Sequence, residues 1–135
     1  MAVYPKKRVF MSFIEEDKQR VWGLRLLAAN PNFDLEFYDE SLRTPIDSLD
    51  AAYIKAKIRA KIDRSSVTVC LISEQTYASR WVDWELDETD RQRKPIIAMA
   101  LKGVTQATLP ALIKQKGLTF YGWDPDNLNT LIRNA

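Results

Sequence analysis

The chain has 135 residues, of which 46% are hydrophobic and 28% charged, as in an ordinary globular domain. Its formal charge of +2 is too small to indicate binding to nucleic acid or to an anionic membrane surface. The absence of histidine and the single cysteine exclude a histidine–cysteine metal site and a serine–histidine–aspartate triad. We therefore expect one domain over residues 1–135, without a metal site.

The sequence also predicts a compartment. No stretch approaches the ~20 apolar residues that a membrane-spanning helix needs. The apolar run behind the basic N-terminus is interrupted by Glu15, Glu16 and Asp17, so the pattern of a signal peptide is missing. Cys70 lies within an apolar run and is expected to be a reduced core residue. We expect a cytoplasmic protein.

Apolar runs and helical periodicity alternate along the chain. Five runs predict strands, at residues 8–13, 35–38, 67–72, 95–101 and 118–121. Four helices are predicted: one that ends at residues 30–32, one with the apolar stripe Ile54, Ile58 and Ile62, one over 81–91 and one over 126–134. Asp47 or Ser48 is the expected N-cap of the second helix, Ser79 that of the third, and Pro125 suits the start of the last. Residues 102–116 predict an irregular loop with one helical turn.

Strands that alternate with helices predict a three-layer α/β domain, in which helices cover both faces of a five-stranded parallel sheet. The unbroken apolar run at 67–72 is typical of a strand buried on both faces. Right-handed crossovers favour the flavodoxin-like strand order 2-1-3-4-5. Ligands of such sheets bind at the carboxyl ends of the strands, which here are residues 12–14, 38–39 and 73–74.

Missing residues exclude several families with this fold. None of the four glycines forms the glycine-rich turn that holds the phosphates of dinucleotides or nucleoside triphosphates. A phospho-accepting receiver domain needs an aspartate at the end of the third strand and a lysine at the end of the fifth. Here these positions hold Ser73 and Gly122, so both functional groups are absent.

The stretch from Trp81 to Leu86 combines two indoles with a carboxylate. On a helix, Trp81 and Glu85 are four residues apart and share a face, and Trp84 adjoins Glu85. A glutamate beside an aromatic wall can polarise a bound sugar while an indole stacks on a planar heterocycle. The structural alternative is a helix whose tryptophans are core residues and whose Glu85 is a solvated charge.

These residues resemble the Toll/interleukin-1 receptor (TIR) domains, and among them the TIR-like proteins of the prokaryotic Thoeris anti-phage system. The resemblance covers roughly residues 6–101 and rests on residues 8–13, 37–41, 65–73 and, most specifically, 77–86. The loop after the second strand lacks the Arg-Asp and Pro-Gly pattern of the animal receptors, because Pro45 is followed by Ile46. The resemblance therefore favours the enzymatic branch of the family over receptor-adaptor signalling.

The resemblance implies that Glu85 is the catalytic residue of an enzyme that cleaves NAD, and that Trp81 stacks on this substrate, with no other cofactor. The pyridinium of NAD leaves as neutral nicotinamide, so one carboxylate suffices where most glycosidases use two. Glu85 would stabilise the oxocarbenium-like transition state or trap it covalently. The family further implies ADP-ribose or a cyclic ADP-ribose isomer as product, the latter a second messenger in anti-phage defence for a separate effector protein.

Further contacts to the substrate are predicted at the strand ends and beside Glu85, from Ser12, Phe13, Asp39, Ser41 and Trp84. Asp39 suits ribose hydroxyls but equally suits a turn, and Trp84 equally suits half-buried packing. Cyclisation needs water to be excluded, and a small single domain offers only an open crevice. We therefore expect self-association, in which a second copy docks through residues 39–46 and completes the site.

Two alternatives stay open at this stage. A non-enzymatic TIR scaffold would use the same fold for self-association and would leave Glu85 as a surface charge. A nucleoside deoxyribosyltransferase-like enzyme shares the layered fold and a glutamate nucleophile, but would act on nucleosides rather than on dinucleotides.

Overall fold

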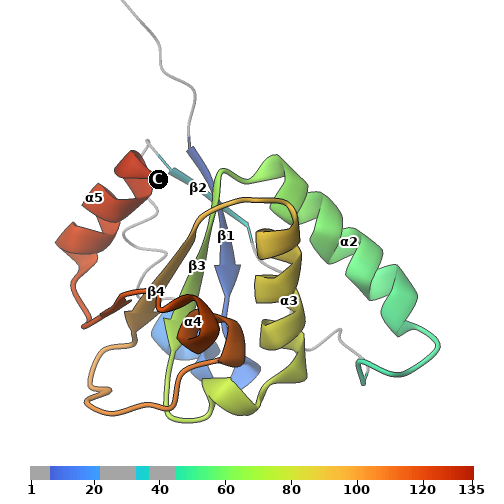
Figure 1. The fold of residues 1–135 in the computed structure, drawn as a ribbon, viewed down its shortest axis with the longest axis horizontal. Helices are drawn as coiled ribbons and strands as arrows, with labels where there is room; N and C mark the ends of the chain where they lie inside the picture. Colours follow the sequence, from blue (N-terminus) through green and yellow to red (C-terminus); the bar gives the residue numbers. More distant parts are fainter. Residues whose placement is uncertain (1–6, 22–32, 37–44) are drawn as a thin grey trace, which may run out of the picture.

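The computed structural model describes residues 7–21, 33–36 and 45–135. Within these residues, five strands form one sheet in the order β2-β1-β3-β4-β5, and every neighbouring pair is parallel (Figure 1). They are β1 (Lys7–Ser12), β2 (Phe33–Glu36), β3 (Val67–Ile72), β4 (Ile96–Ala100) and β5 (Phe120–Tyr121). The predicted parallel sheet and its strand order are confirmed.

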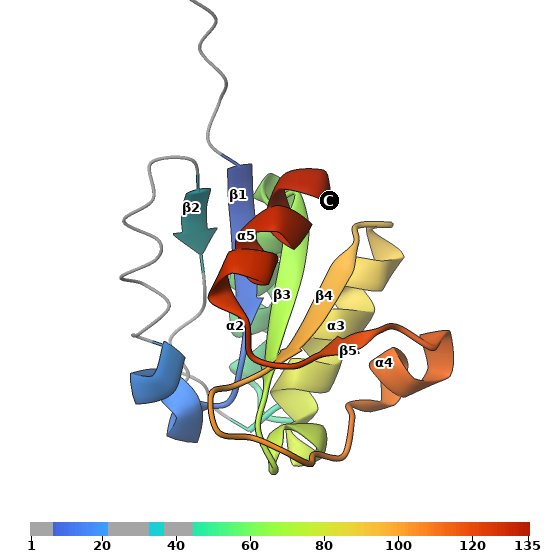
Figure 2. The same ribbon diagram turned by 90° about the vertical axis from the view of Figure 1, so that its left-hand side faces the viewer.

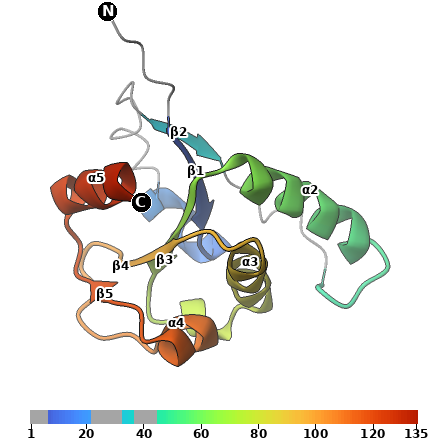
Figure 3. The same ribbon diagram turned by 45° about the horizontal axis from the view of Figure 1, so that its top comes forward.

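Helices cover both faces of this sheet. The described helices are α2 (Ala51–Arg64), α3 (Arg80–Arg91), α4 (Ala111–Lys116) and α5 (Pro125–Asn134), with short 3-10 turns η1 (Glu15–Asp17) and η3 (Thr76–Ala78). Figure 3 shows α2 and α3 on one face and α5 on the other, and Figure 2 shows α4 beside the edge formed by β5. The three predicted layers are therefore confirmed. None of these helices is long and apolar enough to cross a membrane.

The alternation of side chains along the strands builds a separate core on each face of the sheet. The core under α5 includes Val9, Met11, Val69, Leu71, Met99, Leu128 and Ile132. The two clusters on the other face include Phe10, Cys70, Ile72 and Ala98 from the strands and Ile54, Ile58, Ile62, Val82 and Leu86 from α2 and α3. All six residues of β3 are buried, which confirms that this strand lies between two helical layers.

The predicted N-cap of α2 is wrong by two or three residues. Neither Asp47 nor Ser48 caps this helix, which begins at Ala51 after Asp50. The Ser48 N–H donates to the carbonyl of Pro45 (2.9 Å), and the Ala51 N–H donates to the carbonyl of Ser48 (3.2 Å). These hydrogen bonds place Ser48 in turns that precede the helix. The regular helical hydrogen bonds therefore begin further along the chain than the positions of Asp47 and Ser48 suggested.

Other boundaries differ by smaller amounts. The second strand begins at Phe33, two residues before its predicted start, and the fifth strand has two residues instead of four. Of the predicted first helix, residues 18–21 are described and are helical, and the remainder lies outside the described residues. The helical turn predicted within 102–116 is the short helix α4, which ends at Lys116. The next residue, Gly117, caps it in the left-handed conformation (φ 62°) that glycine adopts without strain.

A lysine from the chain before β4 caps the carboxyl end of α2. The Lys94 Nζ donates to the carbonyls of Ile62 (2.8 Å), Asp63 and Ser65 (2.7 Å). A cation at this end of a helix satisfies carbonyls that have no partner within the helix and complements the helix dipole. Lys94, which follows these carbonyls by 29 or more positions in the sequence, thereby helps to fix where α2 ends.

Candidate active site

Helix α3 starts at the carboxyl end of β3, directly after η3. The Oγ of Ser79 accepts a hydrogen bond from the Val82 N–H at 3.1 Å, which confirms Ser79 as the N-cap. This cap fixes the phase of the helix, so that Trp81 falls in the first turn and Glu85 falls one turn later on the same face. Side chains of a helix lean toward its N-terminus, so Glu85 leans toward the turn that carries Trp81.

Glu85 lies at the contact between α3 and the end of β1. The Oγ of Ser12 donates to the Oε1 of Glu85 at 2.8 Å, and both residues are 0% exposed. Ser12 shares the α3-facing side of β1 with Phe10, because alternate residues of a strand point to the same face. The strand β1 therefore supplies a hydroxyl that donates a hydrogen bond to a buried carboxylate.

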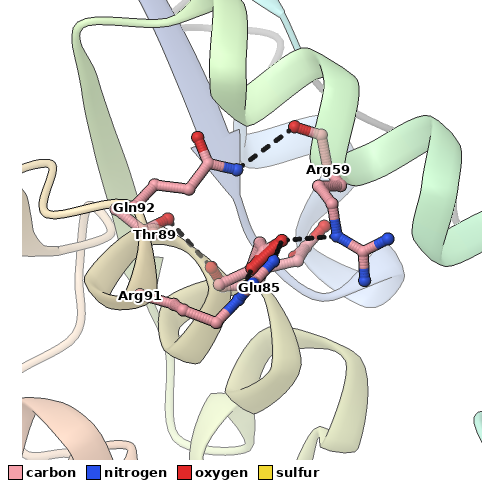
Figure 4. Close-up of polar contacts among 6 residues, drawn as sticks. Arg59, Glu85, Thr89, Arg91 and Gln92 are labelled. Carbon is pink, nitrogen blue, oxygen red and sulfur yellow. Dashed lines mark hydrogen bonds and ion pairs between the residues drawn. The ribbon is translucent and has the colours of Figure 1, made fainter.

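The backbone of Glu85 is fixed as well. The Oγ1 of Thr89 donates to the Glu85 carbonyl at 2.8 Å, a contact drawn in Figure 4. The same hydroxyl lies 2.8 Å from the Oγ1 of Thr68 in β3. Helix α3 is thus joined by buried hydrogen bonds to β1 through Ser12 and to β3 through Thr68, which sets the position of Glu85 along the sheet.

Cys70 lies on the same side of the sheet as Glu85 and is fully buried. Burial, and to a smaller extent the negative charges of Glu85 and Asp83, raise the pKa of the Cys70 thiol. The raised pKa keeps the thiol protonated at neutral pH, and burial makes it a poor nucleophile. The prediction that Cys70 is a core residue is confirmed.

A cleft of about 840 Å³ opens at the carboxyl ends of β1 and β3, a size typical of sites for small molecules and cofactors. The described residues of its wall are Ile14, Glu16, Pro45, Ile46, Asp47, Gln75, Tyr77, Ala78, Ser79, Arg80 and Trp81. Trp81 belongs to this wall, whereas Glu85 does not, because its carboxylate is directed at Ser12. The cleft therefore has the expected position, but the expected glutamate lies one helical turn behind it.

The other predicted contacts divide into three groups. The Phe13 side chain packs in the core under α5, on the face of the sheet opposite to Glu85, because it follows Ser12 directly on an extended chain. Trp84 is half-buried and meets Trp81 edge to face, with ring centroids 6.2 Å apart. It is not among the residues that form the described wall of the cleft. Asp39 and Ser41 lie outside the described residues.

The sequence analysis did not single out several side chains that form the cleft. Tyr77 is about half exposed there, and Arg80 forms an ion pair of 3.6 Å with Asp47, another residue of the wall. Their position could have indicated them: Tyr77 and Arg80 lie four residues and one residue before Trp81, where the chain passes from β3 into α3. In a parallel sheet this turn is where ligands bind.

A second buried carboxylate joins two parts of the wall. The Ser73 Oγ donates to the Oδ2 of Asp17 at 2.5 Å, and the Ser73 N–H donates to the Oγ1 of Thr76 at 2.8 Å. Burial raises the pKa of Asp17, and the hydrogen bond from Ser73 and the charge of Arg20 oppose this rise. The buried side chains of Asp17, Ser73 and Thr76 thus tie η1 to η3.

The family model described as Thoeris protein ThsB, TIR-like domain, matches residues 10–106. The match covers more than half of the chain and includes Ser12, Trp81 and Glu85. The chain belongs to this TIR-like family.

Among solved structures, 13 chains match this one. One is the TIR domain of the Toll-related receptor TRR-2 from the lower metazoan Hydra magnipapillata, with 20% sequence identity and a TM-score of 0.60. The alignment covers 93% of this chain and 97% of that chain. At this identity the likeness shows the shared fold alone. A comparison with curated proteins finds no match.

Proposed function

We propose that this TIR-like domain cleaves NAD at the bond between nicotinamide and ribose, with Glu85 as the catalytic carboxylate. The main observation in support of the proposal is the position of Glu85, one turn after Trp81 on helix α3, whose first turn lines the cleft. Some TIR domains cleave NAD, which supports this activity for a member of the ThsB TIR-like family. The proposal assigns the nicotinamide ring to the Trp81 side of the cleft.

The reaction needs one negative charge and no acid. The C–N bond breaks, its electron pair stays with the departing nitrogen, and the pyridinium becomes neutral nicotinamide. Positive charge then develops on the ribose, where a carboxylate stabilises it electrostatically or forms an ester with it. Water completes hydrolysis to ADP-ribose and releases a proton. If a nitrogen of the adenine attacks instead, the product is a cyclic ADP-ribose isomer.

Access to Glu85 is part of the proposal. Its carboxylate is fully buried, and Ser12 holds Oε1 from the side of the sheet. The substrate has to reach the carboxylate from the side of Trp81, which is 9% exposed and belongs to the wall of the cleft. We therefore propose that the Trp81 indole shifts when NAD binds and that Ser12 keeps Glu85 oriented during this shift.

The product and the assembly belong to the same proposal. Cyclisation needs the adenine folded back onto the ribose and water kept out. We propose that a second copy of the chain covers the cleft, and that the product is a second messenger sensed by a separate effector protein in anti-phage defence. If the chain self-associates but does not cleave NAD, the alternative of a non-enzymatic TIR scaffold applies.

The test is to incubate the purified protein with NAD, at high concentration and with a crowding agent, and to separate the products by mass spectrometry. Glu85→Gln keeps an acceptor for Ser12 and should lower nicotinamide release by at least ~10²-fold. Asp126→Asn, which removes an exposed carboxylate from α5 on the other face of the sheet, is the matched control.

Each outcome of this experiment decides between functions. Release of nicotinamide by the wild type and by Asp126→Asn, but not by folded Glu85→Gln, supports the proposal. Full activity of Glu85→Gln excludes the mechanism. Absence of turnover in every condition favours the scaffold, and cleavage of deoxynucleosides instead of NAD favours the deoxyribosyltransferase-like alternative.

A further inference from the structure

We propose that Arg80 binds the diphosphate of the dinucleotide and that Asp47 holds this guanidinium in place until the diphosphate replaces it. This inference rests on the proposed function, because it assigns a second part of the NAD molecule to the cleft. It names a residue that determines specificity for a dinucleotide over a nucleoside.

Arg80 has the position that this role requires. Among the described residues of the wall, it is the only cation, and it is the first residue of α3, next to Trp81. In NAD a single ribose separates the nicotinamide ring from the diphosphate. A ring stacked on Trp81 therefore leaves the diphosphate within reach of the long side chain of the adjacent residue. Guanidinium groups bind two phosphate oxygens at once, which suits a diphosphate.

The ion pair that Arg80 makes is easily exchanged. Its Nη1 lies 3.6 Å from the Oδ2 of Asp47, and the two side chains are 69% and 73% exposed. Exposed pairs of this kind contribute little stability, because water and salt compete for both charges. A diphosphate carries more negative charge than one carboxylate and can accept hydrogen bonds from several N–H groups of the guanidinium. It should therefore replace Asp47 without loss of fold.

The charges of the wall favour a ligand with both signs. Besides Arg80, the described wall carries two carboxylates, from Glu16 and Asp47. These acids weaken the binding of a purely anionic ligand to Arg80, whereas NAD combines an anionic diphosphate with a cationic pyridinium. The two carboxylates of the wall can thus interact with the pyridinium, and Arg80 can bind the diphosphate.

The first experiment compares Arg80→Gln with wild type on two substrates, NAD and nicotinamide riboside, which lacks phosphate. The variant should raise KM for NAD by at least about tenfold, the loss expected for a charge-assisted hydrogen bond, with kcat little changed. Its kcat/KM for nicotinamide riboside should equal that of the wild type. Arg133→Gln, the same substitution at an exposed position of α5, should change neither substrate. Equal losses on both substrates would show a structural role and overturn the inference.

The second experiment removes the competing acid. Asp47→Asn should lower KM for NAD by about two- to fivefold, because the exposed pair no longer has to be broken. In the Arg80→Gln background the same change should have no effect, since the pair is already absent. An unchanged KM in Asp47→Asn, or an equal change in both backgrounds, would show that Asp47 does not compete for Arg80.

A third experiment separates this inference from the proposed catalysis. Inorganic pyrophosphate is titrated into wild type, Arg80→Gln and Glu85→Gln proteins, and binding is followed by NMR shifts. Binding to wild type and Glu85→Gln, weakened at least about tenfold in Arg80→Gln, supports the diphosphate site even if no variant cleaves NAD. Equal binding to all three, or binding to none, overturns it whether or not NAD is cleaved.

Discussion

The hydroxyl of Ser12 and the carboxylate of Glu85 are 2.8 Å apart, although 73 residues separate them in the sequence. The contact joins the end of the first strand to the second turn of α3, on the side of the sheet that α2 and α3 cover. A carboxylate taken out of water is costly unless it accepts hydrogen bonds, and Ser12 supplies one. The strand therefore contributes to the site through the orientation of Glu85 rather than through contact with the open cleft.

Ser12→Ala should lower kcat for NAD cleavage by about tenfold, less than Glu85→Gln does, because the carboxylate remains but loses a donor that orients it. The free energy of unfolding should fall by about 1–3 kcal/mol, since the carboxylate stays buried with fewer partners. Ser12→Thr keeps the hydroxyl and serves as the control. An unchanged kcat in a folded Ser12→Ala protein, measured beside its melting temperature, would remove Ser12 from the catalytic arrangement.

Trp81 combines two roles that substitution can separate. It packs in the cluster with Phe10 and the α2 stripe, and it also forms part of the wall of the cleft. Trp81→Phe keeps an aromatic face and should keep most of the activity, with a modest loss of stability. Trp81→Ala should lose about 3–5 kcal/mol of stability from packing, and about 1–3 kcal/mol of substrate binding if the indole stacks on the ring.

The measurement for Trp81 is melting temperature beside kinetics at a temperature where both variants are folded. Equal specific activity of Trp81→Ala and wild type, together with a large fall in melting temperature, would assign Trp81 to the core alone.

The features that sequence reasoning found are local or periodic. The Ser79 cap depends on residues three apart, and the stripe of Ile54, Ile58 and Ile62 depends on the helical repeat. The motif with Trp81 and Glu85 was found for the same reason, since its members lie within one turn of each other. Parallel pairing and strand order followed from the alternation of elements and from the handedness of their connections.

Features that depend on how distant elements meet were not found. The sequence analysis did not single out Arg59 of α2, whose Nε lies 2.6 Å from the Oε1 of Glu88 in α3. The crossing of α2 over α3 creates this pair, and side-chain patterns do not give crossing angles. The burial of Glu85 against Ser12 has the same origin, because the depth of a helix on a sheet depends on packing along its whole length.

Glu88 should stabilise the fold in a pH-dependent way. It is 4% exposed and forms ion pairs with Arg91 of α3 and with Arg59 of α2. Both arginines are labelled in Figure 4. Hydrogen bonds from Arg91 and then Arg59 lower the pKa of Glu88. A lowered pKa in the folded state gives stability that is present above the unfolded pKa and is lost as pH falls through the folded value.

Glu88→Gln should therefore lower the free energy of unfolding at pH 7 by about 1–2 kcal/mol, a modest value because both arginines are largely in water. The difference from wild type should shrink as the pH falls below the ordinary glutamate value of 4.5. Asp87→Asn is the control, since burial raises the pKa of that neighbouring carboxyl and its neutralisation should cost nothing at pH 7. Urea unfolding at several pH values measures both, and a Glu88→Gln effect independent of pH would contradict the ion-pair assignment.

Asp17 should show the opposite dependence. Burial raises its pKa, so the folded state binds a proton more tightly than the unfolded state does. The stability that this group contributes is present below the unfolded pKa, near 3.8, and is lost as pH rises through the folded value. Asp17→Asn keeps an oxygen to accept from Ser73 and removes the buried charge. Its stability relative to wild type should therefore increase between pH 4 and pH 7, and a constant or decreasing difference in urea unfolding would contradict the burial argument.

Assembly should control the activity. If a second copy covers the cleft, only associated chains exclude water and cleave NAD efficiently, so specific activity should fall on dilution as the complex dissociates. A tandem fusion of two copies raises the effective concentration of the partner and should keep its activity at the same dilution. The measurement is nicotinamide release over several decades of protein concentration, with light scattering to give the oligomeric state. Specific activity that stays constant in a protein that is monomeric throughout would show that one chain builds the complete site.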